Sequence, residues 1–220
     1  LHTRRRRQRQ MCIRDSLSFS GSGQMKQDIL GEQWMMGTRT GGQDPTGKNM
    51  AEMAEFLNRR SVGAELEFSL TKSELWALIS RSGNLNECHP FCRQNDPIEW
   101  HENSHIDRLE YLNGLTYVRH FLNWNEESGY DLVIGEKDGP QSYVVWKITE
   151  LANGKCRLSI TVYPYLLADI NKAISLLPFV FYIRPKLRNY LKSVLRGFVF
   201  YADNNQPVPR NHWGRHSWFS

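Results

Sequence analysis

The residues best suited to chemistry lie on two expected strands that flank Asn113-Gly114, a dipeptide typical of tight β-hairpin turns. With a two-residue turn there, Asp107 is predicted to pair with His120 across the hairpin, and Tyr111 points to the same face of the sheet. A carboxylate that orients an imidazole is a general-base arrangement, and a nearby phenol can supply a proton. A satisfied polar pair with no catalytic role is the simpler interpretation of the same pattern.

The same pairing assigns a face to every side chain of the hairpin. The face expected to point inward is the more apolar one, and it carries Asp107, Leu109, Tyr111, Thr116, Val118, His120, Leu122 and Trp124. The other face opposes Arg108 to Arg119, which solvent can screen and an apolar interior cannot. A shift of the register by one residue would invert this assignment.

Aromatic residues make up 12% of the chain, and several of them could line a pocket for a flat or aliphatic ligand. Those predicted to bind a ligand are Trp76, Trp124, Tyr130, Trp146 and Tyr163. Core packing is the simpler explanation for any one of them, because aromatic side chains bury large areas. The set therefore supports a pocket better than its single members do.

The run Cys88-His89-Pro90-Phe91-Cys92 contains residue types that bind metals, but its spacing does not favour a metal site. Zinc sites commonly use four ligands and a C-x₂-C spacing that this run lacks, and Pro90 disfavours the helix that would align the two thiols. The sequence also lacks phosphate-binding glycine loops and a nucleophile-elbow motif in a strand–turn–helix context. No metal and no cofactor are therefore predicted.

The segments around these residues predict an antiparallel sheet. Apolar and polar residues alternate from Val62 to Leu70, and Thr71 with Glu74 forms a capping box that begins a helix ending near Gly83. A short helical or irregular piece is expected over 85–91. Strands are then expected at 106–112, 115–124, 130–135, 142–151 and 156–163, because turn residues separate these runs and no helical periodicity interrupts them.

Helical periodicity returns toward the C-terminal end. Pro185 suits the first turn of a long amphipathic helix, and residues 168–181 are expected to be helical with a break or kink at Pro178. The tail 204–220 carries Trp213, Trp218 and Phe219, and it is expected to pack onto the domain as a structural clasp.

The order of these elements resembles the START/Bet v 1-like (SRPBCC) superfamily, especially its polyketide cyclase/dehydrase and lipid transport branch. The run Ser73-Glu74-Leu75-Trp76-Ala77-Leu78-Ile79-Ser80, the segment 83–91 and the terminal helix carry the resemblance, which covers residues 60–203. It implies an α+β helix-grip fold, in which a curved antiparallel sheet wraps around a long C-terminal helix and two short helices follow the first strand. It also implies an apolar cavity with His89 near its mouth and with Tyr190 and Val194 of the last helix among the ligand-binding residues. The superfamily has no common catalytic set, so the resemblance assigns no catalytic role.

The net charge of +5 comes entirely from residues 1–16, which contain six arginines and one aspartate. Met11-Cys12-Ile13-Arg14-Asp15-Ser16 reads like a translated sequencing adapter, so we interpret residues 1–16 as an artefact. Without them the chain is neutral, and no nucleic-acid partner is predicted. Residues 17–54 are expected to be a poorly ordered lead before a domain spanning 55–203, with Met25 or Met50 as the natural start.

No signal peptide and no membrane span are predicted, because the longest apolar stretch, 173–183, is too short and is interrupted. Three cysteines remain outside the N-terminal run, an odd number that indicates a reducing, cytoplasmic compartment.

These observations support three functions. The first is binding or transport of a hydrophobic small molecule, of lipid, polyketide-like or isoprenoid type, in an internal cavity. The second is a cyclase or dehydratase that uses Asp107, His120 and Tyr111 as acid–base groups. The third is a protein-interaction module that uses the tail or the lead. The sequence specifies neither the ligand nor the oligomeric state.

Overall fold

The computed structural model describes residues 50–220, with side chains from Met53 onward. The interpretations of residues 1–16 and 17–49 lie outside this range. The strands are β1 (Val62–Phe68), β2 (Cys92–His101), β3 (Ser104–Tyr111), β4 (Thr116–Asn125), β5 (Gly129–Gly135), β6 (Gln141–Glu150) and β7 (Cys156–Tyr163). The helices are α1 (Met50–Leu57), α2 (Lys72–Ser80), α3 (Leu85–Cys88), η1 (Ala152–Gly154), α4 (Lys172–Pro178), η2 (Phe179–Ile183) and α5 (Arg184–Asn204).

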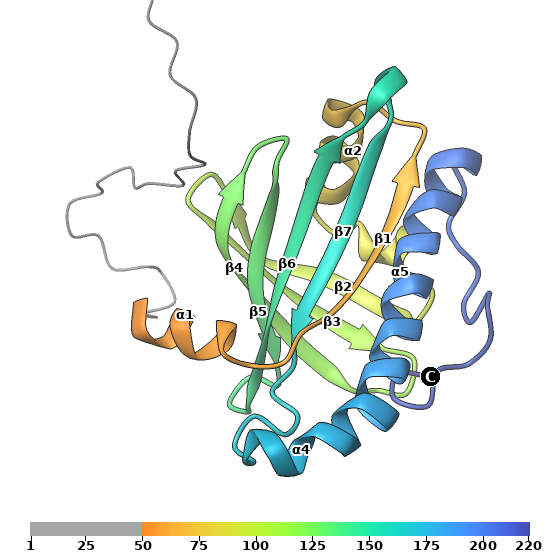
Figure 1. Cartoon of the computed structure of the whole chain (residues 1–220). Coiled ribbons are helices and arrows are strands. Elements are labelled where there is room, and N and C mark those ends of the chain that lie inside the picture. The colour runs from red at the N-terminus through yellow and green to blue at the C-terminus, as the bar shows by residue number, and fades with distance from the viewer. Residues whose placement is uncertain (1–49) are drawn as a thin grey trace, which may run out of the picture. The chain divides into compact units, whose positions relative to one another are not determined.

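The seven strands form one antiparallel sheet in the order β1-β7-β6-β5-β4-β3-β2. The chain meanders from β2 to β7, and β1 joins the far edge by pairing with β7. The sheet is curved, and the long helix α5 packs against it beside β1 (Figure 1). The α+β helix-grip fold predicted from the sequence is confirmed, including the two short helices α2 and α3 after the first strand.

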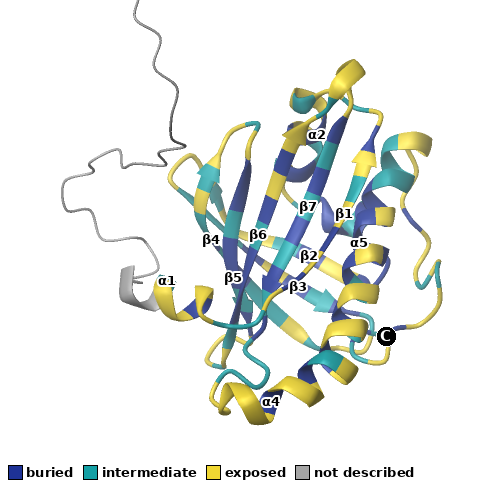
Figure 2. Cartoon of the chain, viewed as in Figure 1, coloured by how far each residue is buried: buried dark blue, intermediate teal, exposed yellow. Residues whose placement is uncertain are grey.

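The main hydrophobic core lies between the sheet and α5. Leu158 and Ile160 of β7 and Leu195 and Phe198 of α5 are almost completely buried in it. Figure 2 shows α5 buried along part of its surface and exposed along the rest, as expected for an amphipathic helix that packs against a sheet.

A second, smaller cluster covers part of the opposite face of the sheet. Phe56 of α1 stacks on Tyr143 of β6, with ring centroids 5.9 Å apart, and both pack with Val133 of β5. Helix α1 begins at Met50, five residues before the position expected for the start of the domain.

The capping box predicted at the start of α2 is present. The backbone N–H of Glu74 donates to the Thr71 hydroxyl at 3.3 Å, and the backbone N–H of Thr71 donates to the Glu74 carboxylate at 2.8 Å. This pair satisfies two amide donors that a helix start otherwise leaves without partners.

Strand β2 was not expected from the sequence, because Pro97 lies within it. Proline cannot donate to a sheet ladder, and the first strand expected after residue 91 was the one at 106–112. β2 is an edge strand, and its pairing with β3 is irregular between Pro97 and Glu99. A proline is tolerated at such a position.

The β3–β4 hairpin differs from the prediction by one residue. The backbone N–H of Tyr111 donates to the Leu115 carbonyl at 2.8 Å, so the loop has three residues, and Gly114 adopts φ 89°. Asp107 therefore lies opposite Arg119, and His120 lies opposite Ile106. A three-residue loop with a left-handed last residue uses the same Asn-Gly dipeptide as a two-residue turn, which explains the wrong register.

The α-helical geometry changes at Pro178, as expected, but the helical run does not end there. Helix α4 continues through the π-helical segment η2 directly into α5, so the helical run extends from Lys172 to Asn204. Pro178 has no backbone N–H to donate within the helix, and the π-helical segment follows directly after it. None of the helices described between residues 50 and 220 is both long and apolar enough to cross a membrane.

The tail after α5 runs back along the domain. The Val208 N–H donates to the Glu87 carbonyl at 2.8 Å, and the Asn211 N–H donates to the Pro90 carbonyl at 2.9 Å. Further along, Phe219 stacks on Tyr111 with ring centroids 4.4 Å apart. These contacts bring the last aromatic residues of the chain against β3.

Candidate functional site

A pocket of about 580 Å³ lies between the sheet and the C-terminal helix. Its walls are mainly apolar. They include Leu109 of β3, Leu132 and Ile134 of β5, Val144 and Trp146 of β6, Ile160 and Val162 of β7, and Leu187, Leu191 and Val194 of α5. The alternation of β-strand side chains explains this lining, because every second residue of each strand faces α5. Trp218 and Phe219 of the tail also line the pocket, although the sequence analysis treated the tail as a clasp only.

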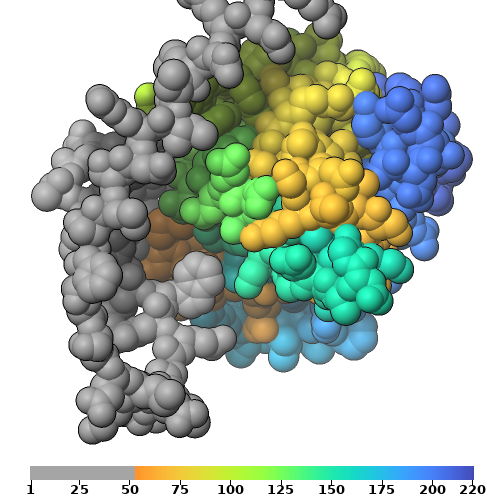
Figure 3. Space-filling model, turned by 90° about the horizontal axis from the view of Figure 1, so that it is seen from above, coloured from red at the N-terminus to blue at the C-terminus, as the bar shows by residue number. Residues whose placement is uncertain are grey.

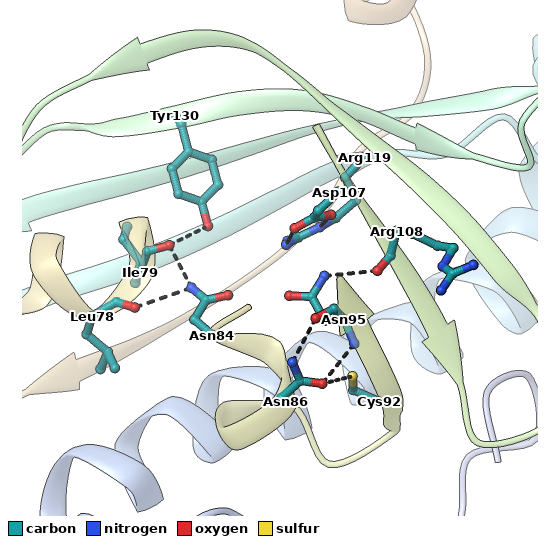
Figure 4. A network of polar contacts seen from close by, with 10 residues as sticks. All are labelled: Leu78, Ile79, Asn84, Asn86, Cys92, Asn95, Asp107, Arg108, Arg119 and Tyr130. Carbon is teal, nitrogen blue, oxygen red and sulfur yellow. Dashed lines mark hydrogen bonds and ion pairs between the residues drawn. The ribbon is translucent and has the colours of Figure 1, made fainter. Parts of the chain in front are cut away.

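Arg119 is the one charged residue in this lining, and it is buried. Its Nε donates to Asp107 Oδ1 at 2.7 Å, and its Nη2 donates to Asp107 Oδ2, which makes a two-pronged ion pair (Figure 4). Burial lowers the pKa of the guanidinium, but the charge and hydrogen bonds of Asp107 outweigh this effect and hold the pKa above its ordinary value. Arg119 therefore stays positively charged.

The third nitrogen of the Arg119 guanidinium, Nη1, has no hydrogen-bond partner among the described residues. Unlike Arg60 Nε, which is buried without a partner, Nη1 is not sealed from solvent. Because Arg119 lines the pocket, Nη1 offers its two N–H donors to whatever occupies that space.

A chain of hydrogen bonds joins three further side chains of the lining. The backbone N–H of Phe91 donates to Nδ1 of His89 at 3.2 Å, so the neutral imidazole carries its proton on Nε2. His89 Nε2 lies 2.9 Å from the Tyr190 hydroxyl, which lies 3.1 Å from the Tyr111 hydroxyl. The imidazole therefore donates to Tyr190. Either hydroxyl can donate in the Tyr111–Tyr190 contact, and three protons serve two hydrogen bonds, so one hydroxyl proton of this pair remains for a further acceptor.

These three groups are uncharged at neutral pH. Burial, followed by the positive charges of Arg119 and Arg210, lowers the pKa of His89 to about 3. Burial raises the pKa of both Tyr111 and Tyr190 above that of an ordinary tyrosine. The polar end of the pocket therefore presents one cation and one phenolic donor, within walls that are otherwise mainly hydrocarbon.

Four of the eight residues predicted to bind a ligand line this pocket, namely His89, Trp146, Tyr190 and Val194. Trp76, Trp124 and Tyr130 lie outside the lining, in an aromatic cluster in which Trp124 stacks on Tyr130 with centroids 5.4 Å apart. Tyr163 packs against Tyr143 on the opposite face of the sheet, with the smaller cluster.

The predicted pairing of Asp107 with His120 is wrong, because the register differs by one residue. Asp107 and Tyr111 do point inward, where both are buried, but Asp107 is paired with Arg119. His120 follows Arg119 in the strand and therefore points to the opposite face. The corrected register turns Tyr117, Arg119 and Phe121 inward, and the irregularity between Phe121 and Asn123 returns Trp124 to the inner face.

Arg119 is the residue that the sequence analysis missed. The sequence analysis placed the charged Arg119 on the solvent-facing side of its strand. It paired the carboxylate of Asp107 with His120 instead. Asp107 and Arg119 would have been found together if the three-residue turn had been considered, because the pair is then directly cross-strand.

An asparagine network fixes the segment that carries His89. Asn84 Nδ2 donates to the Ile79 carbonyl at 2.7 Å, which ties the start of α3 to the end of α2. Asn86 Nδ2 donates to the Asn95 carbonyl at 2.7 Å, and the Asn95 N–H donates back to Asn86 Oδ1 at 2.8 Å (Figure 4). These bonds hold α3 against β2 and so position His89 beside α5.

Among the described residues, those around His89 belong to no group of three or more side chains placed to hold a metal ion. Cys88 and Cys92 are buried and free, and burial raises the pKa of each thiol to about 12. The His89 ring is held by Tyr190 and by the Phe91 backbone, as described above. The thiols therefore stay protonated at neutral pH and behave as small core side chains.

No family model and no curated protein sequence matches this chain. Solved structures do resemble it. DynU16, a protein of the dynemicin biosynthetic locus, matches with a TM-score of 0.50 at 11% identity, over 67% of this chain and 48% of its own. The present chain thus spans about half the length of DynU16. Protein MLL2253 from Mesorhizobium loti matches with a TM-score of 0.50 at 12% identity, over 67% of this chain and 99% of its own.

A START superfamily protein from Mycobacterium smegmatis also matches, with a TM-score of 0.47 at 13% identity, over 64% of this chain and 97% of its own. At these identities the similarity concerns the fold. The seven-stranded curved sheet, the paired short helices and the long C-terminal helix together give the chain a START/Bet v 1-like fold.

Proposed function

We propose that this protein binds or transports a hydrophobic small molecule, of lipid, polyketide-like or isoprenoid type, in the pocket between the sheet and α5. The observation that carries the proposal is the pocket itself. Its volume of about 580 Å³ lies within the range of small-molecule sites, and its walls are mainly apolar.

The polar end of the pocket supports an orientation for the ligand. Arg119 Nη1 has no partner among the described residues, and the Tyr111–Tyr190 pair has one hydroxyl proton left over, so a ligand with an oxygen acceptor at one end satisfies these donors. Burial makes this recognition strong, because an unpaired donor in an apolar environment is costly. An amphipathic molecule with one oxygen-bearing end fits better than a pure hydrocarbon.

The geometry favours binding over the cyclase or dehydratase alternative. The general base of that alternative required an imidazole beside the Asp107 carboxylate, and that carboxylate is engaged by Arg119. His89, the histidine of the pocket lining, has a pKa lowered to about 3 and is a weak base. Three free, buried cysteines also support the proposal that the protein acts in a reducing compartment such as the cytoplasm.

Native mass spectrometry of freshly purified protein tests the proposal. We expect a co-purified small molecule that organic extraction removes, and we expect the Val194→Trp variant to lose it because the larger side chain fills the pocket. Ile98→Trp is the matched control, since Ile98 is exposed and lies outside the pocket lining. Equal retention of the molecule by both variants, or no binding of any amphipathic probe by the wild type, would contradict the proposal.

A further inference from the structure

Six of the eight exposed large apolar side chains of the described residues lie close together in the sequence, between Ile170 and Tyr182. They are Ile170, Ile174, Leu176, Leu177, Phe181 and Tyr182, and we call this set the α4 patch. Ile174, Leu177 and Phe181 are 72%, 64% and 76% exposed, which leaves most of each side chain in water. Only two other large hydrophobic residues of the described chain, Leu57 and Ile98, are comparably exposed.

The α4 patch follows from the sequence of α4 and η2. Apolar residues occur on all sides of this segment, so the side chains that pack inward, such as Phe179 and Ile183, leave others on the outer side. Figure 2 shows α4 largely exposed, at the end of the domain where the long helix begins. A concentrated patch of this kind marks an interaction surface.

Basic residues without acidic partners accompany the patch. Between Ile170 and Ala202 the chain has six lysines and arginines and no acidic residue. Three arginines, Arg60, Arg184 and Arg188, line a depression of about 410 Å³ together with Phe179 and Val180. None of the three makes an ion pair with any described residue, and Arg60 Nε is buried without a hydrogen-bond partner.

The patch also adjoins the pocket. Tyr182 belongs both to the α4 patch and to the pocket lining, and Pro178 and Ile183 of the same segment line the pocket as well. Lys186 Nζ lies over the Tyr182 ring, 4.2 Å from its centroid. A positive charge therefore lies beside a residue that the patch and the pocket share.

We propose that the α4 patch and the three arginines form a docking surface for an anionic lipid membrane. The apolar side chains enter the boundary between headgroups and acyl chains, while Arg60, Arg184 and Arg188 contact anionic headgroups, as in amphipathic helices that lie in a membrane surface. A second copy of the chain fits less well, because a symmetric contact through this surface would oppose the same arginines to one another. The docking does not depend on which ligand the pocket holds.

Vesicle co-sedimentation tests the docking surface. The parent protein is the full chain with Arg4, Arg5, Arg6 and Arg7 replaced by glutamine, because that basic run would itself attract anionic lipid. We expect binding to phosphatidylcholine vesicles that contain about one-third phosphatidylglycerol and weaker binding to pure phosphatidylcholine. Salt should reduce the difference between the two.

Two double variants separate the apolar and the charged contributions. Ile174→Ser with Phe181→Ser, and Arg184→Gln with Arg188→Gln, should each reduce the affinity for anionic vesicles at least about fivefold. The controls are Ile98→Ser, and Lys137→Gln with Lys155→Gln, which change other exposed residues away from the patch and should bind like the parent. Unchanged binding by both double variants would overturn the proposal. The proposal would also be overturned if the parent protein did not bind vesicles but formed a dimer that Phe181→Ser dissociates in sedimentation velocity.

Discussion

Arg119 concentrates the polar chemistry of the interior in a single side chain. Two of its three guanidinium nitrogens are held by Asp107, and this two-pronged contact fixes the plane in which the third nitrogen meets the pocket. Desolvation makes such a pair expensive to form, so its net contribution to stability is small, but removing one partner leaves an uncompensated charge. Asp107 is therefore a positioning residue for the donor at Arg119.

Replacing Asp107 with alanine should destabilise the protein by about 3–5 kcal/mol, since it strands the buried Arg119 charge. Chemical denaturation at neutral pH measures the change. The control is Glu67→Ala, which removes the exposed ion pair between Glu67 and Arg157 and should have little effect. Similar losses in the two variants would show that the Asp107–Arg119 pair is not buried as described.

His89 should make stability depend on pH. Its pKa is lowered to about 3 in the folded protein and is about 6.5 in an unfolded chain, so the unfolded state binds the extra proton between these values. Stability contributed by the neutral imidazole is complete above about pH 6.5 and is lost as the pH falls, at up to about 1.4 kcal/mol per pH unit.

His89→Gln should flatten that dependence between about pH 6 and pH 4, as measured by urea denaturation at several pH values. His101→Gln serves as the control, because His101 is exposed and its replacement should leave the slope as in the wild type. A slope that His89→Gln leaves unchanged would contradict the burial of a neutral imidazole.

At the scale of elements, the pocket depends on how closely α5 approaches α3. Gly197 lies where the two meet, and a Cβ atom there would overlap the Cys88 carbonyl oxygen. Glycine is needed at this position for close approach and not for its backbone angles, since Gly197 is helical. The contact places Tyr190 of α5 within hydrogen-bond distance of His89, the residue after α3.

Gly197→Ala should therefore destabilise the protein by more than about 2 kcal/mol, against the small gain that alanine normally brings to a helix. Thermal and urea unfolding measure the change. Gly63→Ala is a suitable control, because a Cβ there would make ordinary contacts, the nearest at 3.4 Å from Thr161 Oγ1. A neutral Gly197→Ala variant would mean that α5 and α3 are farther apart than described.

The elements themselves were largely predictable from the sequence, and the exceptions have physical causes. Periodicity and turn residues predicted the strands β1 and β3 to β7, the capping box at Thr71 and the long C-terminal helix. Strand β2 was missed because a proline argues against a strand unless that strand lies at the edge of a sheet. The sequence does not show which strand lies at an edge. The predicted hairpin register was wrong because Asn113-Gly114 is compatible with loops of two and of three residues. The one-residue difference in register places Arg119 on the inner face of the sheet and His120 on the outer face.

At the scale of the whole molecule, the domain has an apolar interior and, on its outside, one surface that is both apolar and basic. The sheet and α5 enclose the pocket, and the α4 patch with its arginines lies where α4 joins α5 (Figure 3 shows the domain from above). The overall charge of the chain conceals this asymmetry, because the basic residues of α5 are balanced by acidic residues elsewhere. Sequence composition alone could not locate it.

The central claim is that the pocket holds an amphipathic molecule, and a methyl NMR titration with decanoate tests it most directly. We predict that the methyl signals of Leu132, Val144 and Val194, which line the pocket, shift on addition of decanoate, and that those of Val133 on the opposite face do not. The Arg119→Met variant should weaken the binding, because the carboxylate loses its donor. Shifts confined to Ile174 and Leu177 of the α4 patch, or no shifts at all, would contradict the claim.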